Sequence, residues 1–308
     1  MRLVFMVTGE ISEPTFASAL GGGHDIVGLV TQPDRPVGRK QVLTPPRVKE
    51  MAIAAGVPVI QPENVSSPEA LEAIRQWDPE IIVVMAYGQI LSQSLIDLPS
   101  RAIINLHASL LPKYRGASCI QAALRHGDAE TGWTVLHVVK RLDAGNVICQ
   151  TRLAISDGET GGELHDRLAA AGPDALAQGL RLLQNGDVPG EPQDESRQSY
   201  APKLGRGDGE LDWSRPAEEL ERLIRAFHPW PGTTGKLNKK RLKIFPPVQI
   251  GHGEGTPGAF LGLANGSPEI ACGSGSLVLG EVQLEGSRRM SGVELARGHH
   301  DALTAGLK

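Results

Sequence analysis

Two side chains suited to carbonyl chemistry stand two residues apart in the middle of the chain. Asn105 and His107 lie at the end of an apolar run, Ala102–Leu106, that predicts a buried strand. Side chains two residues apart on a strand point to the same side. An asparagine amide donates hydrogen bonds without ionising, and a histidine donates, accepts or carries a proton near neutral pH. The pair therefore suits negative charge that develops on a carbonyl oxygen.

A carboxylate follows in the segment RLDAGNV. Asp143 precedes Ala144 and Gly145 in a turn that is predicted to follow another strand, so the carboxylate can approach His107 and orient its imidazole. Taken singly, each of these three polar residues is more often a turn former or a satisfied polar group. Together, at the carboxyl ends of strands where open α/β sheets bind ligands, they favour a catalytic site.

The elements before residue 187 alternate between strand-like and helix-like segments, which predicts a doubly wound, mostly parallel Rossmann-like α/β sheet. The predicted strands are Leu3–Val7, Asp25–Gln32, Val57–Ile60, Ile81–Ala86, Ala102–His107 and Trp133–Val139. A helix is expected from Pro68, with Ser67 as its N-cap, and a long helix over Glu163–Gln184. No GxGxxG follows the first strand, which argues against NAD and FAD.

The composition changes after this first part. Residues 187–208 are rich in Pro, Gly, Gln and charge and predict a linker between a domain over 1–186 and a second domain over 209–308. In the second domain a helix is expected from Leu211 to Phe227. Short strands then follow at Lys240–Phe245, Pro257–Leu261, Glu269–Cys272 and Ser276–Val282, a pattern typical of a small barrel.

Bulk properties narrow the class of protein. The chain has 308 residues, a formal net charge of -4 and three scattered cysteines without a disulfide or metal pattern. The apolar start is too short for an export signal, and we expect a cytoplasmic protein without a membrane span or a bound metal. With this net charge, an RNA partner would need locally gathered cations.

Several segments, in the same order along the chain, are similar to one known family. They are TQPDRPVGR (Thr31–Arg39), VVMAYGQIL (Val83–Leu91), NLHASLLPKYRG, RLDAGNV, SYAPKL (Ser199–Leu204), LDW (Leu211–Trp213), PWPG (Pro229–Gly232), KRLKI (Lys240–Ile244) and GTPG (Gly255–Gly258). With them the chain resembles the methionyl-tRNA formyltransferases of the folate-dependent formyltransferase family. The stretch Thr8–Thr15 departs from the family's usual GTPxFAVP pattern, which leaves its substrate contacts open.

The resemblance implies a fold and a reaction. The second domain would be an OB-like barrel that binds tRNA. The enzyme, expected to be a monomer, would transfer the formyl group of 10-formyltetrahydrofolate to the α-amino group of methionyl initiator tRNA. Asn105 and His107 would stabilise the oxyanion, and Asp143 would orient His107 and carry a proton. The residues expected to form the folate pocket are Ser109, Leu110, Leu111, Pro112, Met85, Ala86, Tyr87, Gly88 and Gln89.

Two basic clusters are candidates for the RNA contact. Arg35, Arg39 and Lys40 lie in a long connection, Pro33–Pro46, which the residues alone leave equally open to being a solvated loop. The resemblance favours contact with the acceptor end of tRNA. The second cluster, of Lys239, Lys240, Arg241 and Lys243, is either a soluble strand edge or a phosphate track.

Rival functions share part of this pattern. A formyltransferase acting on a nucleotide-linked amino sugar would share the NLHxSLLPKYRG and KRxDAG segments. A glycinamide ribonucleotide transformylase or a formyl-folate hydrolase would share the Asn, His and Asp set but would not account for the second domain as well. A non-catalytic RNA-binding module would not need that set. The basic connection and the region from SYAPKL to LDW favour the tRNA enzymes.

Overall fold

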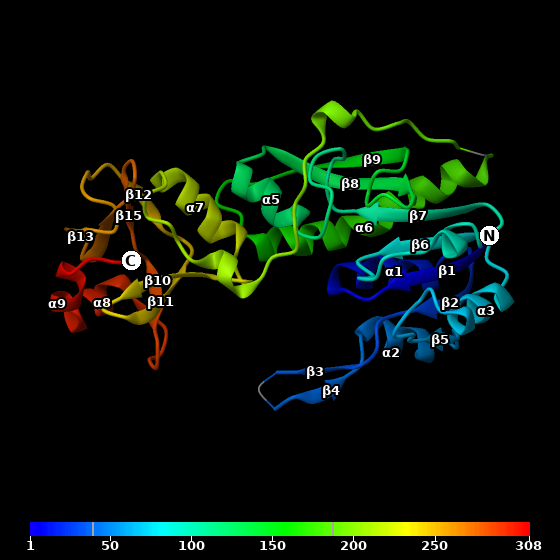
Figure 1. Ribbon diagram of the computed structural model, residues 1–308, viewed down its shortest axis with the longest axis horizontal. Helices are drawn as coiled ribbons and strands as arrows, with labels where there is room; N and C mark the ends of the chain where they lie inside the picture. The colour runs from blue at the N-terminus through cyan, green and yellow to red at the C-terminus, as the bar shows by residue number, and fades with distance from the viewer. Residues whose placement is uncertain (39, 187) are drawn as a thin grey trace. The chain divides into compact units, whose positions relative to one another are not determined.

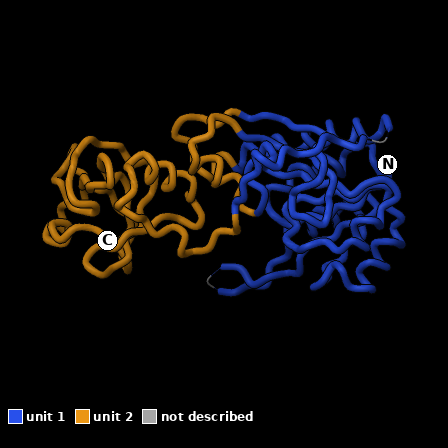
Figure 2. The backbone as a smooth tube through the Cα atoms, turned by 45° about the horizontal axis from the view of Figure 1, so that its top comes forward, with its two compact units in different colours: residues 1–116, 131–153, 165–201 blue, residues 117–130, 154–164, 202–308 orange. Residues whose placement is uncertain are grey.

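The chain folds into two compact units that interleave along the sequence, in a computed structural model that describes residues 1–38, 40–186 and 188–308. The first unit contains Met1–Gly116, Thr131–Leu153 and His165–Ala201, and the second contains Ala117–Glu130, Ala154–Leu164 and Pro202–Lys308 (Figures 1 and 2). Two short segments from within residues 1–186 therefore belong to the second unit. The single ranges 1–186 and 209–308 stay a prediction about folding domains.

A seven-stranded sheet in the order β5-β2-β1-β6-β7-β8-β9 forms the first unit (Figure 1). Its strands are β1 Arg2–Val7, β2 Asp25–Val30, β5 Val59–Ile60, β6 Ile81–Met85, β7 Ala102–His107, β8 Glu130–His137 and β9 Val147–Ala154. The first five strands in that order are parallel, and β8 pairs antiparallel with β7. The predicted mostly parallel α/β sheet is confirmed.

Burial explains why the central strands were recognisable. Val4 and Ile82 are fully buried and Ile103 is 4% exposed, as expected for strands covered on both faces. Helices supply the cover: η1 Glu10–Ser12, α1 Glu13–Leu20, α2 Arg47–Ala54, α3 Pro68–Gln76, α4 Gln93–Ile96 and α6 Gly161–Gln184. The predicted Ser67 cap is confirmed, since its side chain accepts a hydrogen bond from the Ala70 amide.

Helix α6 packs closely on β8. A side chain at Gly179 would come within 2.8 Å of Val135, so this glycine permits the close approach. The Trp133 indole donates a 2.8 Å hydrogen bond to the Leu168 carbonyl of the same helix. These contacts hold in place the strand from which the chain turns toward Asp143.

Two features of the first unit differ from expectation. Residues Arg35–Val37 and Val42–Thr44 pair as the antiparallel strands β3 and β4, so the connection expected to be irregular is a hairpin. Arg39 lies outside the described residues. Strand β9 was not predicted, because its burial is irregular at the edge of the sheet and gives neither an alternating nor a continuous apolar pattern.

The second unit contains two four-stranded antiparallel sheets, β10-β11-β16-β17 and β12-β15-β14-β13. The strands are β10 Thr233–Leu237, β11 Lys240–Phe245, β12 Gln249–Gly251, β13 Phe260–Ala264, β14 Ser267–Ala271, β15 Ser276–Val278, β16 Glu281–Leu284 and β17 Met290–Ser291. The helices are α5 Cys119–His126, α7 Ala217–Ala226, α8 Gly292–Gly298 and α9 His300–Thr304. The single strand predicted over Ser276–Val282 is wrong, because the chain passes from one sheet to the other at Leu279 and Gly280.

The predicted linker is divided between the two units, and most of its described residues lie outside helices and strands. Up to Ala201 it belongs to the first unit, and from Pro202 it belongs to the second. It contains the short helices η2 Glu195–Arg197 and η3 Arg206–Gly209. None of the described helices is long and apolar enough to cross a membrane.

Candidate active site

The three side chains singled out from the sequence lie together at the carboxyl end of β7. The Asn105 amide donates to one carboxylate oxygen of Asp143 at 3.3 Å. The His107 Nδ1 atom lies 3.7 Å from the other oxygen, a distance at which charges attract but which is longer than a hydrogen bond. An amide, an imidazole and a carboxylate therefore share one site in the first unit.

Both nitrogens of His107 face oxygen atoms. Nε2 lies 2.8 Å from the Tyr114 carbonyl, opposite the nitrogen that faces Asp143. The residue is 6% exposed, so its ring orientation is fixed by the protein rather than by water. A ring with oxygen atoms on both sides is suited to donating hydrogen bonds rather than to accepting them.

The Asp143 turn holds an uncommon backbone conformation. Its φ is +49°, in the left-handed region that a side chain with Cβ seldom adopts. The carboxylate also accepts a 2.8 Å hydrogen bond from the Gly116 amide. Gly145 must lack a side chain, because a Cβ would lie 1.7 Å from the His137 carbonyl. The turn thus directs the carboxylate toward β7.

The predicted folate-pocket turn, Ser109–Pro112, is anchored by a buried threonine on β8. The Thr134 hydroxyl donates to the Ser109 carbonyl at 2.6 Å and accepts from the Leu111 amide at 3.1 Å. The Ser109 hydroxyl is itself used inside the turn, where it donates to the Lys113 carbonyl at 2.7 Å. Leu111 is buried and Leu110 is half-buried, so this turn offers mainly backbone groups and apolar surface.

The second predicted folate segment, Met85–Gln89, follows β6. Met85 and Tyr87 are buried, and burial raises the pKa of the Tyr87 phenol. The Gln89 side chain accepts from the Val65 amide at 2.8 Å, which fixes the loop. Ala86 and Gly88 are exposed, so the surface offered here consists mainly of backbone.

The predicted basic residues are exposed where the structure describes them. Arg35 and Lys40 belong to the hairpin of β3 and β4 in the first unit. In the second unit, Lys239 and Lys240 lie where β10 turns into β11. Arg241 and Lys243 alternate with the buried Leu242 and Ile244, as expected for an outward-facing basic strand.

Sequence reasoning missed the residues that support the site. Thr134 gave no signal, because a threonine in an apolar strand is ordinary. Gln193 and Ser199 lie in the segment taken for a linker. The Ser199 Oγ atom accepts a 2.9 Å hydrogen bond from the Tyr114 amide, so this segment contacts the site. Within the described residues, no group of three His, Cys, Asp or Glu side chains could hold a metal ion.

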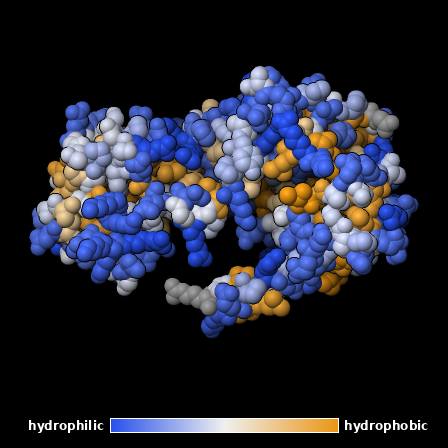
Figure 3. All heavy atoms as spheres, in the orientation of Figure 1, coloured by the Kyte–Doolittle hydropathy of each residue, from blue (hydrophilic) through white to orange (hydrophobic). Residues whose placement is uncertain are grey.

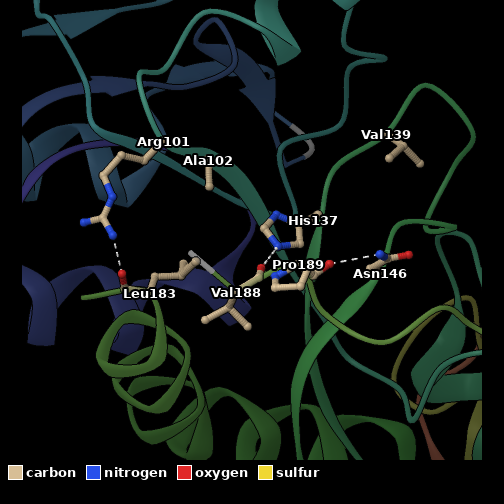
Figure 4. Close-up of a pocket in the computed structure, with 8 residues that line it drawn as sticks. All are labelled: Arg101, Ala102, His137, Val139, Asn146, Leu183, Val188 and Pro189. Atoms are coloured by element: carbon tan, nitrogen blue, oxygen red, sulfur yellow. Dashed lines mark hydrogen bonds between the residues drawn. The ribbon is translucent and has the colours of Figure 1, made fainter. Parts of the chain in front are cut away.

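A separate cavity of about 570 Å³ lies near the amino end of β7 (Figure 4). It is lined by Arg101, Ala102, His137, Val139, Asn146, Leu183, Val188 and Pro189. None of these is a predicted site residue. Its labelled polar side chains are hydrogen-bonded to main-chain oxygens of Leu183, Val188 and Pro189. These hydrogen bonds join parts of the fold to one another.

Comparisons with known proteins identify the family of the chain. The formyl transferase family profile matches residues 1–180, and the profile of the formyl transferase C-terminal domain matches residues 203–300. A methionyl-tRNA formyltransferase from Akkermansia muciniphila is 52% identical over 305 residues, which cover 97% of this chain and 97% of the relative. Both halves of the chain and their order are therefore shared with this group.

Solved structures at much lower identity share the fold. The N-formyltransferase from Helicobacter canadensis, in complex with folinic acid and dTDP-3-aminofucose, has a TM-score of 0.67 at 16% identity over 94% of this chain and 99% of its own. HypX from Aquifex aeolicus, in complex with tetrahydrofolic acid, has a TM-score of 0.63 at 16% identity over 96% of this chain. This chain spans 47% of HypX, about half its length. By its family profiles and its near full-length identity to the relative, the chain belongs to the methionyl-tRNA formyltransferases of the formyl transferase family.

Proposed function

We propose that the protein transfers the formyl group of 10-formyltetrahydrofolate to the α-amino group of methionyl initiator tRNA. The observation that carries this proposal is the meeting of Asn105, His107 and Asp143 around one point at the carboxyl end of β7. The 52% identity to a methionyl-tRNA formyltransferase supports the acceptor. As the sequence predicts, we propose that the active protein is a monomer.

The chemistry requires help at the carbonyl oxygen more than at the amine. An α-amino group has a pKa of about 7.7 to 8.0, so a useful fraction is already unprotonated at neutral pH. Its nitrogen attacks the formyl carbon, a new C–N bond forms, and the bond from that carbon to the folate nitrogen breaks. Between these steps the oxygen is negatively charged and needs donors that are already in place.

Asn105 and His107 are the proposed donors to that oxygen, His107 through Nδ1, whose 3.7 Å distance to Asp143 is longer than a hydrogen bond. One N–H of the Asn105 amide is occupied by Asp143, which leaves the second for the substrate. Asp143 orients the amide and the imidazole. It also takes the proton that the attacking nitrogen loses and returns it to the leaving folate nitrogen.

The folate is proposed to lie between the turn Ser109–Pro112 and the loop Met85–Gln89. The Gln89 amide and the Ser109 hydroxyl are used to fix these two segments. Exposed backbone groups at Ala86 and Gly88 would therefore read the pterin edge, beside the apolar Leu110.

The RNA is proposed to contact both basic clusters. The β3–β4 hairpin combines Arg35 and Lys40 with Val37, Val42 and Leu43, which are 56, 58 and 64% exposed. Figure 3 shows apolar and hydrophilic side chains side by side on this hairpin. Such a surface suits both the phosphates and the unstacked bases of an RNA end.

One competition assay tests the proposal. Formyl transfer from 10-formyltetrahydrofolate is measured with charged initiator tRNA, charged elongator tRNA and a nucleotide-linked amino sugar as acceptors. We expect the initiator tRNA to be formylated and the sugar to remain unchanged. Formylation of the sugar alone would replace the proposal with the rival reaction, and tRNA binding without any transfer would indicate an RNA-binding module.

A further inference from the structure

The segment Val188–Ala201, referred to below as the connecting segment, is bound to the turn that carries Asp143. Its first residues are held by the His137 imidazole on the Val188 carbonyl at 2.6 Å and by the Asn146 amide on the Pro189 carbonyl at 2.9 Å (Figure 4). Two 2.8 Å backbone hydrogen bonds also join Val147 and Glu191. The connecting segment therefore follows the edge of the sheet beside the proposed catalytic carboxylate.

Gln193 holds the Asp143 turn directly. Its side-chain nitrogen donates to the Asp143 carbonyl at 2.7 Å and to the Gly145 carbonyl at 2.8 Å. Both N–H groups of one amide are thus used on a single turn. Because Asp143 has a φ of +49°, its conformation is unfavourable by itself and must be imposed by such contacts.

Arg115 fixes the other end of the Gln193 amide. The Gln193 oxygen accepts from the Arg115 Nε at 3.1 Å and from its Nη2 at 2.7 Å. The guanidinium is 4% exposed and its other contact is the Glu195 carboxylate at 2.9 Å. Since a guanidinium only donates, the oxygen of Gln193 must face Arg115 and the nitrogen must face the turn.

The connecting segment also supports the opposite side of the site. The Ser199 hydroxyl accepts from the Tyr114 amide at 2.9 Å, and the Tyr114 carbonyl lies 2.8 Å from His107. Next to it, the Arg115 amide donates to the Ser199 carbonyl at 2.9 Å. One segment therefore braces the turns next to both the imidazole and the carboxylate.

We propose that Gln193 is a positioning residue for formyl transfer. It holds the Asp143–Gly145 turn so that the carboxylate faces Asn105, His107 and the Gly116 amide. It acts through Asp143 and does not touch the substrates. The inference rests on the proposed function, because formyl transfer is the reaction that the carboxylate would serve.

The substitution Gln193→Glu tests this role with little change in shape. A glutamate keeps the length of the side chain and its contact with Arg115, but its carboxylate has no N–H for the two carbonyls of the turn. We expect kcat to fall between about tenfold and a hundredfold, the scale of a small misplacement of a reacting group. The KM values of both substrates should stay within about twofold, and the protein should remain folded at the assay temperature.

Gln198→Glu is the matched control, since Gln198 is an exposed glutamine of the same segment. It makes the same change of charge and should retain the kcat of the unmodified protein. The amide proton of Gly116, which donates to Asp143, provides a second readout by NMR. Its chemical shift should move in Gln193→Glu and stay in place in Gln198→Glu.

A double variant separates positioning from general support of the fold. If Gln193 acts through the Asp143 carboxylate, adding Gln193→Glu to Asp143→Ala should slow the enzyme no further. Losses that multiply, or a Gln193→Glu variant with unchanged kcat, would overturn the inference. If the unmodified protein formylates no tRNA, the proposed function fails first. If the unmodified protein formylates tRNA and Asp143→Ala is slow but Gln193→Glu is not, only the role of Gln193 is rejected.

Discussion

Asn105 and His107 reach the same carboxylate from one side of one strand, and this contact makes their individual roles testable. Substituting either by alanine removes a proposed donor to the oxyanion and no apolar side chain. We expect Asn105→Ala and His107→Ala each to lower kcat by about two to three orders of magnitude, the scale of one lost oxyanion donor. Initial rates of tRNA formylation with both substrates saturating measure the effect.

The same variants need a stability control. Urea unfolding should give midpoints close to that of the unmodified protein, because both side chains contact polar groups of the site and belong to no apolar cluster of the described residues. Asp143→Asn keeps the size of the side chain and should also be slow and folded. Turnover near that of the unmodified protein in Asn105→Ala or His107→Ala would remove that residue from the mechanism.

The Glu195 carboxyl is expected to make the stability of the fold depend on pH. Hydrogen bonds from Arg115, and then from Arg141, hold the pKa of this carboxyl at about 2, well below its ordinary value of 4.5. Because the pKa is lower in the folded state, the stabilisation is complete above pH 4.5 and is lost as the pH falls toward 2. At pH 6 the urea midpoint of Glu195→Gln should therefore be lower than that of the unmodified protein. This difference in midpoint, the gap referred to below, should be smaller at pH 3.

Glu191→Gln serves as the control for that measurement. It removes an exposed carboxylate from the same segment. The Glu191 backbone pairs with Val147, and the substitution leaves this pairing in place. The gap between this variant and the unmodified protein should be small at both values of pH. A Glu195→Gln gap that does not change between pH 6 and pH 3 would show that the ion pairs with Arg115 and Arg141 do not stabilise the fold.

At the scale of elements, the proposed folate turn depends on one hydroxyl. Thr134 bonds Ser109, Leu111 and, at 2.9 Å, the Gln150 amide. Thr134→Val has nearly the same shape but removes the hydroxyl that pairs with the Ser109 carbonyl and the Leu111 amide, at a cost of about 1–3 kcal/mol for each buried group left unsatisfied. The half-buried Gln150 amide keeps its hydrogen bond to the Leu111 carbonyl. We expect a lower free energy of unfolding in urea and a higher KM for 10-formyltetrahydrofolate, with the KM for tRNA little changed.

Thr134→Ser is the matched variant, because it keeps the hydroxyl and loses only a methyl group. It should retain the KM for the formyl donor. If Thr134→Val and Thr134→Ser have the same KM, the turn Ser109–Pro112 is not part of the folate pocket.

The sequence was informative where an element is defined by its own residues. Continuous apolar runs identified the central strands, and Ser67 with Pro68 identified the start of α3. The hairpin of β3 and β4 was missed because it is exposed, and strand β9 because its burial is irregular. Both depend on pairing with a neighbour rather than on local pattern.

The candidate site divides in the same way. The amide, the imidazole and the carboxylate were found because their types and their places at strand ends carry chemistry. Gln193 could not be found, because its contacts with Arg115 and Asp143 join residues 78 and 50 positions apart. A segment rich in proline and glycine has the composition of a linker, and its sequence does not show which side chains its polar residues contact in the fold.

At the scale of the whole molecule, an acidic protein is proposed to bind a polyanion. The net charge of -4 gives no overall attraction to RNA, so local clusters must supply it. In the second unit the outward residues of β11 face Lys236 on β10 and Gln283 on β16, which leaves Arg241 and Lys243 on a polar sheet surface. Phosphate contacts made there would add directly to the salt dependence of binding.

Removing one such phosphate contact should therefore change the salt dependence of tRNA binding as well as its affinity. We expect Arg241→Ala to weaken tRNA binding and to reduce the slope of log Kd against log salt concentration by about 0.7 to 0.9, the value for one phosphate contact. Adding Lys243→Ala should reduce it by about the same amount again. Filter binding of initiator tRNA between low and moderate salt measures both slopes.

Arg75→Ala is the matched control for this series, because it removes the same charge from the surface of α3, where Arg75 pairs with Glu72 at 2.6 Å. It changes the net charge as Arg241→Ala does but lies outside the proposed RNA surface. Its slope should equal that of the unmodified protein. If Arg241→Ala and Arg75→Ala lower the slope equally, only the overall charge matters, and the outward face of β11 is not the path of the RNA.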